Sequence, residues 1–289
     1  MTSEPITDVA PADPLAALRA AARDRTRARD AAKAADAARR AAGARPKRSA
    51  AELKEIVRRG QAELHGPGWP GASPDATREA TAEEVVAWAA REFGDSIAVA
   101  CSMADAVLPH VVAAIKPWVD VLFLDTGYHF AETYGTRDAV ETSMDVTIVD
   151  IKPQQTVAEQ DAAHGKDLWS RDPGLCCQLR KVEPLHDRLG GYEAWATGVR
   201  REEAPTRTGT PLVSWDAKNG LVKINPLAAW TFDELLAYAT THQVILNPLL
   251  NDGFPSIGCA PCTRRVAPGE DPRSGRWAGL DKTECGLHV

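Results

Sequence analysis

Four of the six cysteines in this 289-residue chain form two close pairs. Cys176 and Cys177 are adjacent, whereas Cys259 and Cys262 form a Cys-x-x-Cys pair. Four thiolates can complete one four-coordinate site, and thiolate-rich sites bind zinc or iron–sulfur clusters. Structural zinc sites usually use two Cys-x-x-Cys pairs, so the adjacent pair favours a cluster, although spacing alone does not decide between the two.

A separate cysteine, Cys285, lies in a polar, glycine-containing segment that is not typical of a core. A free cysteine with an ordinary pKa, roughly 8.5, is mostly protonated at neutral pH, so a reactive one needs a cation nearby. The sequence offers Arg273, Arg276 and His288 for this purpose. From the residues alone, Cys285 is either a reactive thiol or an incidental one.

Further cations follow the adjacent cysteines and a predicted strand. Arg180 and Lys181 come after Cys177, where they could offset the charge of thiolates or bind an anionic substrate. Arg200 and Arg201 follow the predicted strand 194–197, where bidentate pairing with phosphate or sulfate is geometrically available.

The elements that must position these residues alternate between strand and helix. Apolar spacing and capping boxes predict a mostly parallel sheet flanked by helices, an α/β fold. The strands are expected at 97–100, 119–124, 146–151, 194–197 and 221–224, and the helices from Glu52, at 81–93, at 130–143 and from Thr231.

Polar clusters follow two of these strands, at the sheet edge where ligands of such folds bind. The first, Ser102 to Asp105, could aim backbone N–H groups at a phosphate, but it has no glycine and is equally typical of a helix cap. The second comprises Asp125, Thr126 and Gly127, and its glycine permits close approach of a ligand.

Composition limits the class of protein. No apolar run reaches membrane length and no secretory leader is recognisable, so we expect no membrane association and a cytoplasmic location. The net charge is −6, but residues 1–60 carry 14 Lys and Arg against 8 Asp and Glu, a balance of +6. Because acids are interspersed in this Ala/Arg-rich extension, we expect a disordered or loosely helical, solvated segment rather than a nucleic-acid partner.

Together these motifs resemble the assimilatory adenosine 5'-phosphosulfate (APS) reductases of the iron–sulfur, thioredoxin-dependent type found in actinobacteria. The resemblance runs from about residue 52 to the end. The matching stretches are 125–130, the cysteine pair with Arg180-Lys181, Thr197-Gly198 with Arg200-Arg201, 255–263, and Glu284-Cys285-Gly286-Leu287-His288.

The resemblance implies a fold related to the adenine-nucleotide alpha hydrolases, or ATP pyrophosphatases, with a flexible catalytic tail. It implies a [4Fe-4S] cluster on Cys176, Cys177, Cys259 and Cys262 that is not thought to shuttle electrons. Cys285 would attack the sulfur of APS, expelling AMP, and thioredoxin would then release sulfite from the S-sulfocysteine. This reaction belongs to sulfate assimilation and cysteine biosynthesis.

The same resemblance implies substrate-binding residues: Ser102, Asp125, Thr126, Gly127, Lys181, Arg200, Arg201, Arg273, Arg276 and His288. It divides the chain into an extension (1–51), a nucleotide- and cluster-binding reductase domain (52–270) and a mobile tail (271–289). A homo-oligomer is compatible with it.

Three alternatives remain open. A reductase of the 3'-phosphorylated substrate PAPS, or of both substrates, is the nearest, although PAPS-restricted relatives lack the four cluster cysteines. An ATP-dependent transferase of the pyrophosphatase type is disfavoured because the loop at Ser102 lacks the glycines needed to wrap a pyrophosphate. A non-catalytic zinc module would leave Cys285 without a function.

Overall fold

The structure is a computed structural model that describes residues 14–43, 46–280, 282 and 284–287. Its contacts divide the chain into residues 1–45 and residues 46–289, which are described separately. In the described residues, no helix is long and apolar enough to cross a membrane.

The described part of the first unit, residues 14–43, forms the helix α1 (Pro14–Ala42), of 29 residues. Alanine and arginine dominate it, and both residues have high helix propensity. Its large apolar side chains are few, and Leu15 and Leu18 are exposed. Local pairs such as Asp36 with Arg40, whose charged atoms lie 2.6 Å apart, add only modest support.

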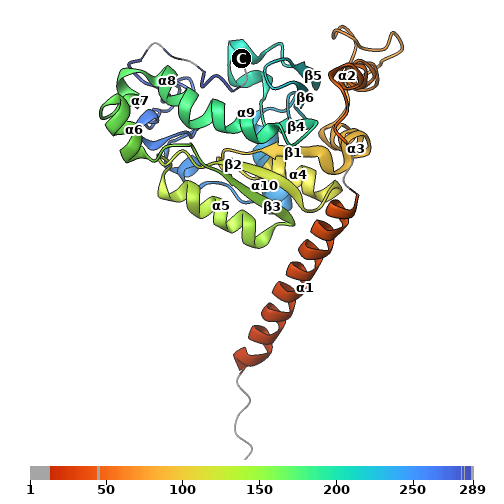
Figure 1. The fold of residues 1–289 in the computed structure, drawn as a ribbon, viewed down its shortest axis with the longest axis horizontal. Helices are drawn as coiled ribbons and strands as arrows, with labels where there is room; N and C mark the ends of the chain where they lie inside the picture. Colours follow the sequence, from red (N-terminus) through yellow and green to blue (C-terminus); the bar gives the residue numbers. More distant parts are fainter. Residues whose placement is uncertain (1–13, 44–45, 281, 283, 288–289) are drawn as a thin grey trace, which may run out of the picture. The chain divides into compact units, whose positions relative to one another are not determined.

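The second unit is built on a sheet of six strands within the described residues (Figure 1). The strand order is β3-β2-β1-β4-β6-β5, and every neighbouring pair is parallel except β5 with β6. The strands are β1 (Ile97–Ala100), β2 (Val119–Leu124), β3 (Val146–Ile151), β4 (Ala194–Thr197), β5 (Val213–Asp216) and β6 (Leu221–Ile224).

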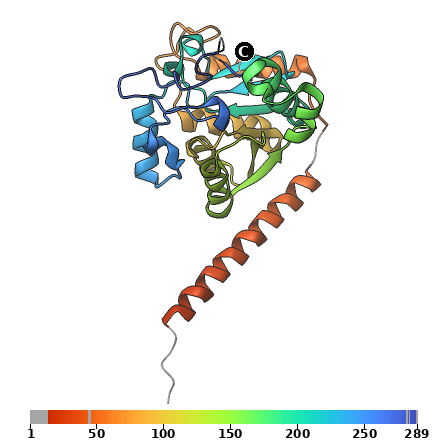
Figure 2. The same cartoon turned by 90° about the vertical axis from the view of Figure 1, so that its left-hand side faces the viewer.

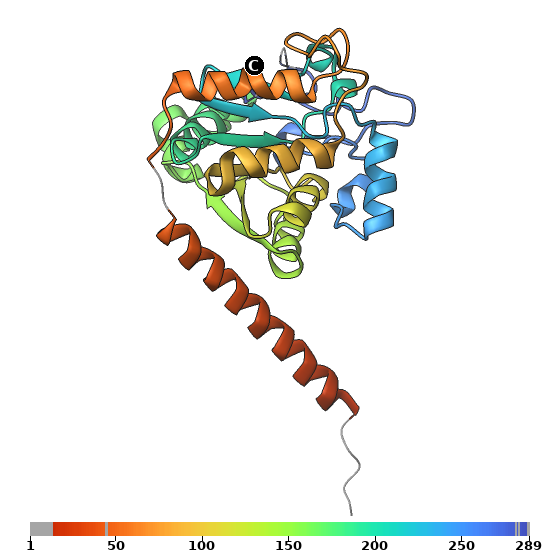
Figure 3. The ribbon, with the colours of Figure 1, turned by 90° about the vertical axis from the view of Figure 1, so that its right-hand side faces the viewer.

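Five helices contribute to the core on one face of the sheet, called here the first face. Alternate strand residues such as Val99 and Val121 point into this core. Figure 3 shows α2 and α3 beside each other, and Figure 2 shows the C-terminal loops, in blue, beside α10. The helices are α2 (Ala50–Leu64), α3 (Ala82–Phe93), α4 (Val107–Ile115), α5 (Ala131–Ser143) and α10 (Phe232–His242).

The opposite, second face carries a smaller core. Leu185 and Leu189 of α9 (Glu183–Leu189) pack there against a group that includes Leu122 and Trp195. The chain enters α9 through α6 (Val157–His164), α7 (Leu168–Arg171), α8 (Pro173–Cys177) and a π-helical turn, η2 (Gln178–Val182). The short 3-10 turns are η1 (Gly94–Ser96), η3 (Arg201–Glu203), η4 (Pro205–Arg207), η5 (Pro248–Asp252) and η6 (Ala260–Cys262).

The five predicted strands occupy the residues expected from the sequence. The helix expected from Glu52 begins at Ala50, because Ser49 and Glu52 form a capping box, and α5 begins one residue later than predicted, after Phe130. The helix cap considered at Ser102 to Asp105 leads into α4, because the Val107 N–H donates to Asp105 Oδ1 at 3.0 Å, although the sequence did not predict the bounds of α4. Sequence patterns did not indicate β5, a short edge strand paired only with β6.

Candidate active site

The adjacent cysteines lie at the end of α8, which leads through η2 into α9. Asp172 caps α8 by accepting a hydrogen bond of 2.8 Å from the Leu175 N–H, and Pro173 occupies the first turn. Both Cys176 and Cys177 are buried. The π-helical turn η2 follows directly, and such turns recur at functional sites.

The second cysteine pair is attached to the turn that follows β2. A hydrogen bond of 3.3 Å joins Thr126 Oγ1 to Cys259 Sγ, and the Ala260 N–H donates to the Tyr128 carbonyl at 2.7 Å. The segment from Cys259 to Cys262 is thus held at the carboxyl end of the sheet.

Arg180 ties the two cysteine segments together. It is 3% exposed; its Nε donates to the Thr126 carbonyl at 2.5 Å and its Nη1 to Gln160 Oε1 at 3.1 Å. Gly127 has φ +74°, and a Cβ there would come within 3.1 Å of Arg180 Nη2. Glycine therefore serves both the backbone conformation and the approach of this guanidinium.

All four cysteines of the two pairs line one small cavity, with Lys181 beside them. Burial raises the pKa of Cys176 to about 12 and that of Cys262 to about 11. Burial acts in the same direction on Cys259, but the charge of Lys181 and hydrogen bonds from Thr126 and Lys181 outweigh it, so the pKa of Cys259 is lowered. Four converging thiols form a donor set suited to zinc or an iron–sulfur centre.

The loop after the second pair brings two arginines to the same place. Trp277 N–H donates to the Cys262 carbonyl at 3.0 Å, and Thr263 forms a bridge with Arg276. The Arg276 guanidinium lies against Gly258, where a Cβ would come within 2.5 Å of its Cζ. Arg276 Nη1 donates to Ser256 Oγ and Nε has no hydrogen-bond partner in the described residues.

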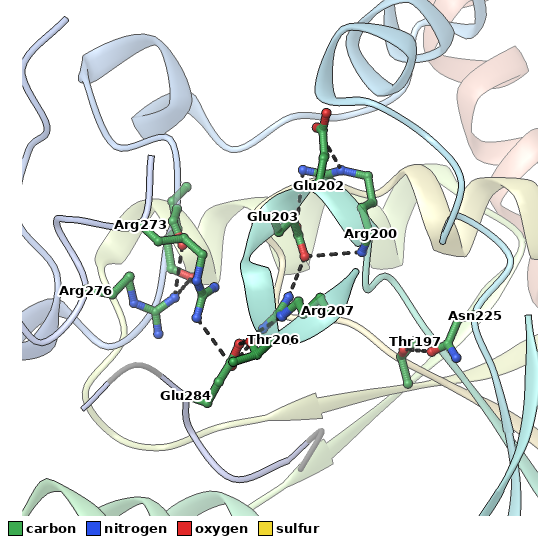
Figure 4. Close-up of polar contacts among 12 residues, drawn as sticks. Thr197, Arg200, Glu202, Glu203, Thr206, Arg207, Asn225, Arg273, Arg276 and Glu284 are labelled. Atoms are coloured by element: carbon green, nitrogen blue, oxygen red, sulfur yellow. Dashed lines mark hydrogen bonds and ion pairs between the residues drawn. The ribbon is translucent and has the colours of Figure 1, made fainter. Parts of the chain in front are cut away.

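The tail carries Cys285 to these cations. Glu284 Oε2 accepts from Arg207 Nη2 at 2.8 Å and from Arg273 Nη2 at 3.3 Å (Figure 4). The Cys285 thiol is half-buried. Burial lowers the pKa of Lys181, but the charges of Cys259 and Cys285 outweigh it and raise that pKa. Burial and Arg273 lower the pKa of Arg276, and the charge of Cys285 acts in the opposite direction. A thiol, a set of cations and a four-thiol cavity therefore meet at one edge of the sheet.

Comparisons with known proteins agree with this geometry. Residues 96–265 match the phosphoadenosine phosphosulfate reductase domain family. The chain is 57% identical to the adenosine 5'-phosphosulfate reductase of Mycolicibacterium smegmatis, covering 82% of this chain and 95% of the relative. It is 55% identical to that of Streptomyces coelicolor, covering 84% of this chain and 97% of the relative. The chain belongs to this reductase family.

A solved structure supports the same assignment. A phosphoadenylyl-sulfate (PAPS) reductase from Candida auris, in complex with phosphate, superposes with a TM-score of 0.54 at 30% identity. The match covers 64% of this chain and 90% of that one. The resemblance predicted from the motifs and the predicted α/β fold class are both confirmed.

Not every predicted substrate residue of this reductase lies at the thiol. Arg201 pairs with Glu79 at 2.6 Å and stacks over Trp69, and Arg200 pairs with Glu203 at 3.2 Å. Both arginines are therefore occupied by other partners, and their contact with substrate stays a prediction.

The remaining predicted residues lie at the carboxyl ends of the strands. Ser102 is exposed after β1, and Asp125 accepts hydrogen bonds from the Tyr134 hydroxyl at 2.6 Å and from the Gly127 N–H at 3.2 Å. Thr126 is buried. His288 lies outside the described residues.

Three residues near the thiol escaped the set predicted from the sequence. Arg207 and Glu284 form an ion pair beside Cys285, and Lys223 of β6 lies over the Trp195 ring at 5.5 Å. Burial lowers the pKa of Lys223, with Arg207 acting in the same direction. The only signal was Glu284 beside the cysteine within a family motif, because pairing between residues 77 positions apart leaves no local pattern.

Proposed function

We propose that this protein reduces APS to sulfite and AMP. The observation that carries the proposal is the position of Cys285, whose thiol lies beside Lys181 and Arg276 at a four-thiol cavity. The choice of APS as the substrate rests on the relatives named APS reductase, which match more than four-fifths of the chain.

In the first step, the Cys285 thiolate attacks the sulfur of the phosphosulfate. A sulfur–sulfur bond forms as the bond from sulfur to the bridging phosphate oxygen breaks. AMP leaves with that electron pair, and Cys285 becomes S-sulfocysteine. The nearby cations stabilise the charge that develops on the leaving phosphate.

In the second step, one thiolate of thioredoxin attacks Cys285 Sγ and displaces sulfite. The second thioredoxin thiol resolves the mixed disulfide, restoring Cys285 and leaving thioredoxin oxidised. The dithiol thereby supplies the two electrons that the sulfur gains. Cys285 must serve a bound nucleotide and then a protein, which is why we propose that residues 271–289 act as a mobile tail on the 52–270 domain.

We further propose that the thiols of Cys176, Cys177, Cys259 and Cys262 hold a [4Fe-4S] cluster. No three His, Cys, Asp or Glu side chains within the described ranges lie close enough to hold a single metal ion, yet all four thiols line one cavity. The adjacent pair Cys176-Cys177 departs from the two Cys-x-x-Cys pairs that are usual for structural zinc, which favours a multi-iron centre. When bound, the cluster would supply a fixed centre of charge beside Lys181.

The same site could accept PAPS. The similarity to the Candida auris enzyme favours testing this second substrate. The strand ends carrying Ser102 and Asp125 to Gly127 are the proposed nucleotide site, with Arg200, Arg201, Arg273, Arg276 and His288 as further anion contacts. A homo-oligomer and a cytoplasmic location stay predictions.

The test is the intact mass of anaerobically purified protein mixed with APS without reductant. We expect one added sulfo group that maps to Cys285, and its release as sulfite on addition of thioredoxin. Cys285→Ser should gain none. Cys101→Ala is the matched control, because burial raises the pKa of Cys101 to about 12 and its loss should leave the adduct intact. If an adduct forms only with PAPS, then PAPS and not APS is the substrate. If neither compound gives an adduct, the proposed mechanism is refuted.

A further inference from the structure

The tail segment that carries Cys285 is held on both sides of the thiol. Before it, Glu284 contacts two arginines from different parts of the chain, Arg207 on η4 and Arg273 in the loop after η6. After it, Lys218 Nζ donates to the Gly286 carbonyl at 2.8 Å. Leu287 packs against the core of the second face.

The contacts of Glu284 differ in kind from those that follow the thiol. Its side chain is 10% exposed, and Arg207 and Arg273 are 12% and 16% exposed. Arg207 reaches both carboxylate oxygens, with Nε at 2.9 Å from Oε1 and Nη2 at 2.8 Å from Oε2. This bidentate geometry fixes the direction of the carboxylate as well as its distance.

Four of the cations around the thiol thereby form two pairs. Arg207 and Arg273 are paired with Glu284, whereas Lys181 and Arg276 form no ion pair with a carboxylate in the described residues. The charge of the Cys285 thiol acts on Lys181 and Arg276, and also on Lys223. The tail lies against the segment of Lys181, because a Cβ on Gly286 would come within 3.7 Å of Val182 Cγ2. The division leaves the second pair available to an anion at the thiol.

Resting on the proposed function, we propose that Glu284 is a positioning residue that docks the tail on Arg207 and Arg273 and so places Cys285 Sγ over the anion held by Lys181 and Arg276. The first step requires the sulfur to approach along one line, and a displacement of about 1 Å can cost roughly a hundredfold in rate. The docking contacts of Glu284 with the two arginines are ionic and partly exposed, so they can also release the tail to a protein reductant.

A competing interpretation makes the opposite prediction. If the carboxylate merely occupied the place of the substrate anion, removing its charge would strengthen nucleotide binding and would not slow the first step. The two interpretations predict different effects of removing the Glu284 charge on the affinity for AMP and on the rate of adduct formation. Measuring both quantities therefore separates them.

The experiment uses the holoenzyme and three variants. Glu284→Gln removes the charge with little change of shape, and Glu284→Asp keeps the charge but shortens the reach. Glu203→Gln is the matched control, because Glu203 also pairs with Arg207 but lies on η3 rather than on the tail. Thermal melting and iron content check that each variant is folded and loaded.

Two measurements are made on each protein. Alkylation of Cys285 by iodoacetamide, mapped by mass, reports docking without any substrate. Single-turnover adduct formation at saturating APS, with the Kd of AMP, reports its effect on the reaction. For Glu284→Gln we expect alkylation to rise about tenfold, adduct formation to fall about a hundredfold and the Kd of AMP to change less than about threefold. Glu284→Asp should lie between, and Glu203→Gln should show smaller changes.

Unchanged alkylation and an unchanged rate in Glu284→Gln would overturn the proposal. Tighter AMP binding with an equal or faster first step would also overturn it, in favour of the competing interpretation. If the wild-type enzyme forms no adduct at all, the proposed function fails, but the alkylation rates still decide whether Glu284 docks the tail.

Discussion

The two faces of the sheet are built from the same strands but are covered in different ways. Helices from five segments bury the first face, and its core is almost entirely apolar, with Val99, Val121 and Phe123 contributed by the strands. The second face has the smaller core under α9, and Leu287 of the tail packs against it. Because successive residues of a strand point to opposite faces, changes on one face need not disturb the other.

This difference between the two faces shows where the protein buries charged groups. The segments that border the second face bring together the thiols, Lys181, Arg207, Arg276 and Glu284. Hydrogen bonds or opposite charges hold Cys259, Arg207, Arg276 and Glu284. Burial of a charge without partners is costly, so this region is stable only while its contacts are complete. The apolar core of the first face buries no such charge cluster, so we expect this core to provide most of the stability of the fold.

Loss of the Cys285 thiol should give the largest difference between the effect on turnover and the effect on the stability of the fold. In Cys285→Ser, turnover of APS should fall by about a thousandfold or more, because the hydroxyl is a far weaker nucleophile. The free energy of unfolding should change little, since Cys285 is half-buried on the tail. Sulfite release with thioredoxin measures the first effect and denaturant unfolding the second, and calorimetry measures whether AMP still binds.

Cys101→Ala serves as the control for Cys285→Ser and should keep most of its turnover. Residual turnover in Cys285→Ser above a hundredth of wild type would show that another group attacks the sulfur. Loss of AMP binding would show instead that the tail is part of the nucleotide site rather than a carrier of the nucleophile.

Loss of a thiol from the four-cysteine cavity should disturb the second face without unfolding the first. Cys259 bonds to Thr126 and neighbours Lys181, so Cys259→Ser should lose bound iron, leave a buried cation without its partner and abolish activity. Iron content, visible absorbance and far-ultraviolet circular dichroism are the measurements.

We expect the helical signal of Cys259→Ser to be largely retained, because the first-face helices do not contact this cavity. A normal iron content would contradict the ligand assignment. Complete loss of helical signal would show that the two faces fold as one cooperative unit.

The sequence predicted the fold well wherever the signal was local. Short apolar runs located the five parallel strands, and the Thr81 and Thr231 capping boxes located α3 and α10. Motifs also located the cysteine pairs and Cys285. Each of these signals lies within a few neighbouring residues, where propensity and periodicity act.

The remainder depends on contacts between distant segments. Arg207 and Glu284 meet only after the chain folds back, and Arg201 is drawn to Glu79, 122 positions away, rather than to the thiol. Nothing in the local pattern distinguishes Arg201 from Arg207, since both are arginines after β4. Pairing choices of this kind are decided by tertiary packing.

A core truncation on the first face should have a smaller effect on activity than either cysteine change. Leu53 of α2 is 1% exposed, so Leu53→Ala should lower the free energy of unfolding by about 2–5 kcal/mol through lost burial and a cavity. Turnover per folded molecule should stay within about twofold. Denaturant melting and kcat measure the two quantities. An activity loss that exceeds the unfolded fraction would contradict the separation of the faces.

The smallest effect should come from an ion pair at the opposite edge of the sheet from the site. Glu193, just before β4, is 6% exposed and accepts from Arg48 Nη2 at 2.7 Å. Burial tends to raise the pKa of Glu193, but the hydrogen bonds and charge of Arg48 outweigh it and lower the pKa. Glu193→Gln should cost about 1–3 kcal/mol at neutral pH, because charge-assisted hydrogen bonds to a buried group are lost.

The pH dependence of that loss tests its cause. Because the folded pKa of Glu193 lies below the unfolded value, the pair stabilises the protein fully above the unfolded pKa, roughly 4.3, and the contribution disappears as pH falls through the folded pKa. The stabilities of wild type and Glu193→Gln should therefore converge in acid. Glu92→Gln, which removes a looser pair with Arg59 at 3.3 Å, should differ from wild type by less than about 1 kcal/mol. A difference for Glu193→Gln that persists below the folded pKa would show that packing, and not charge, holds this edge of the sheet.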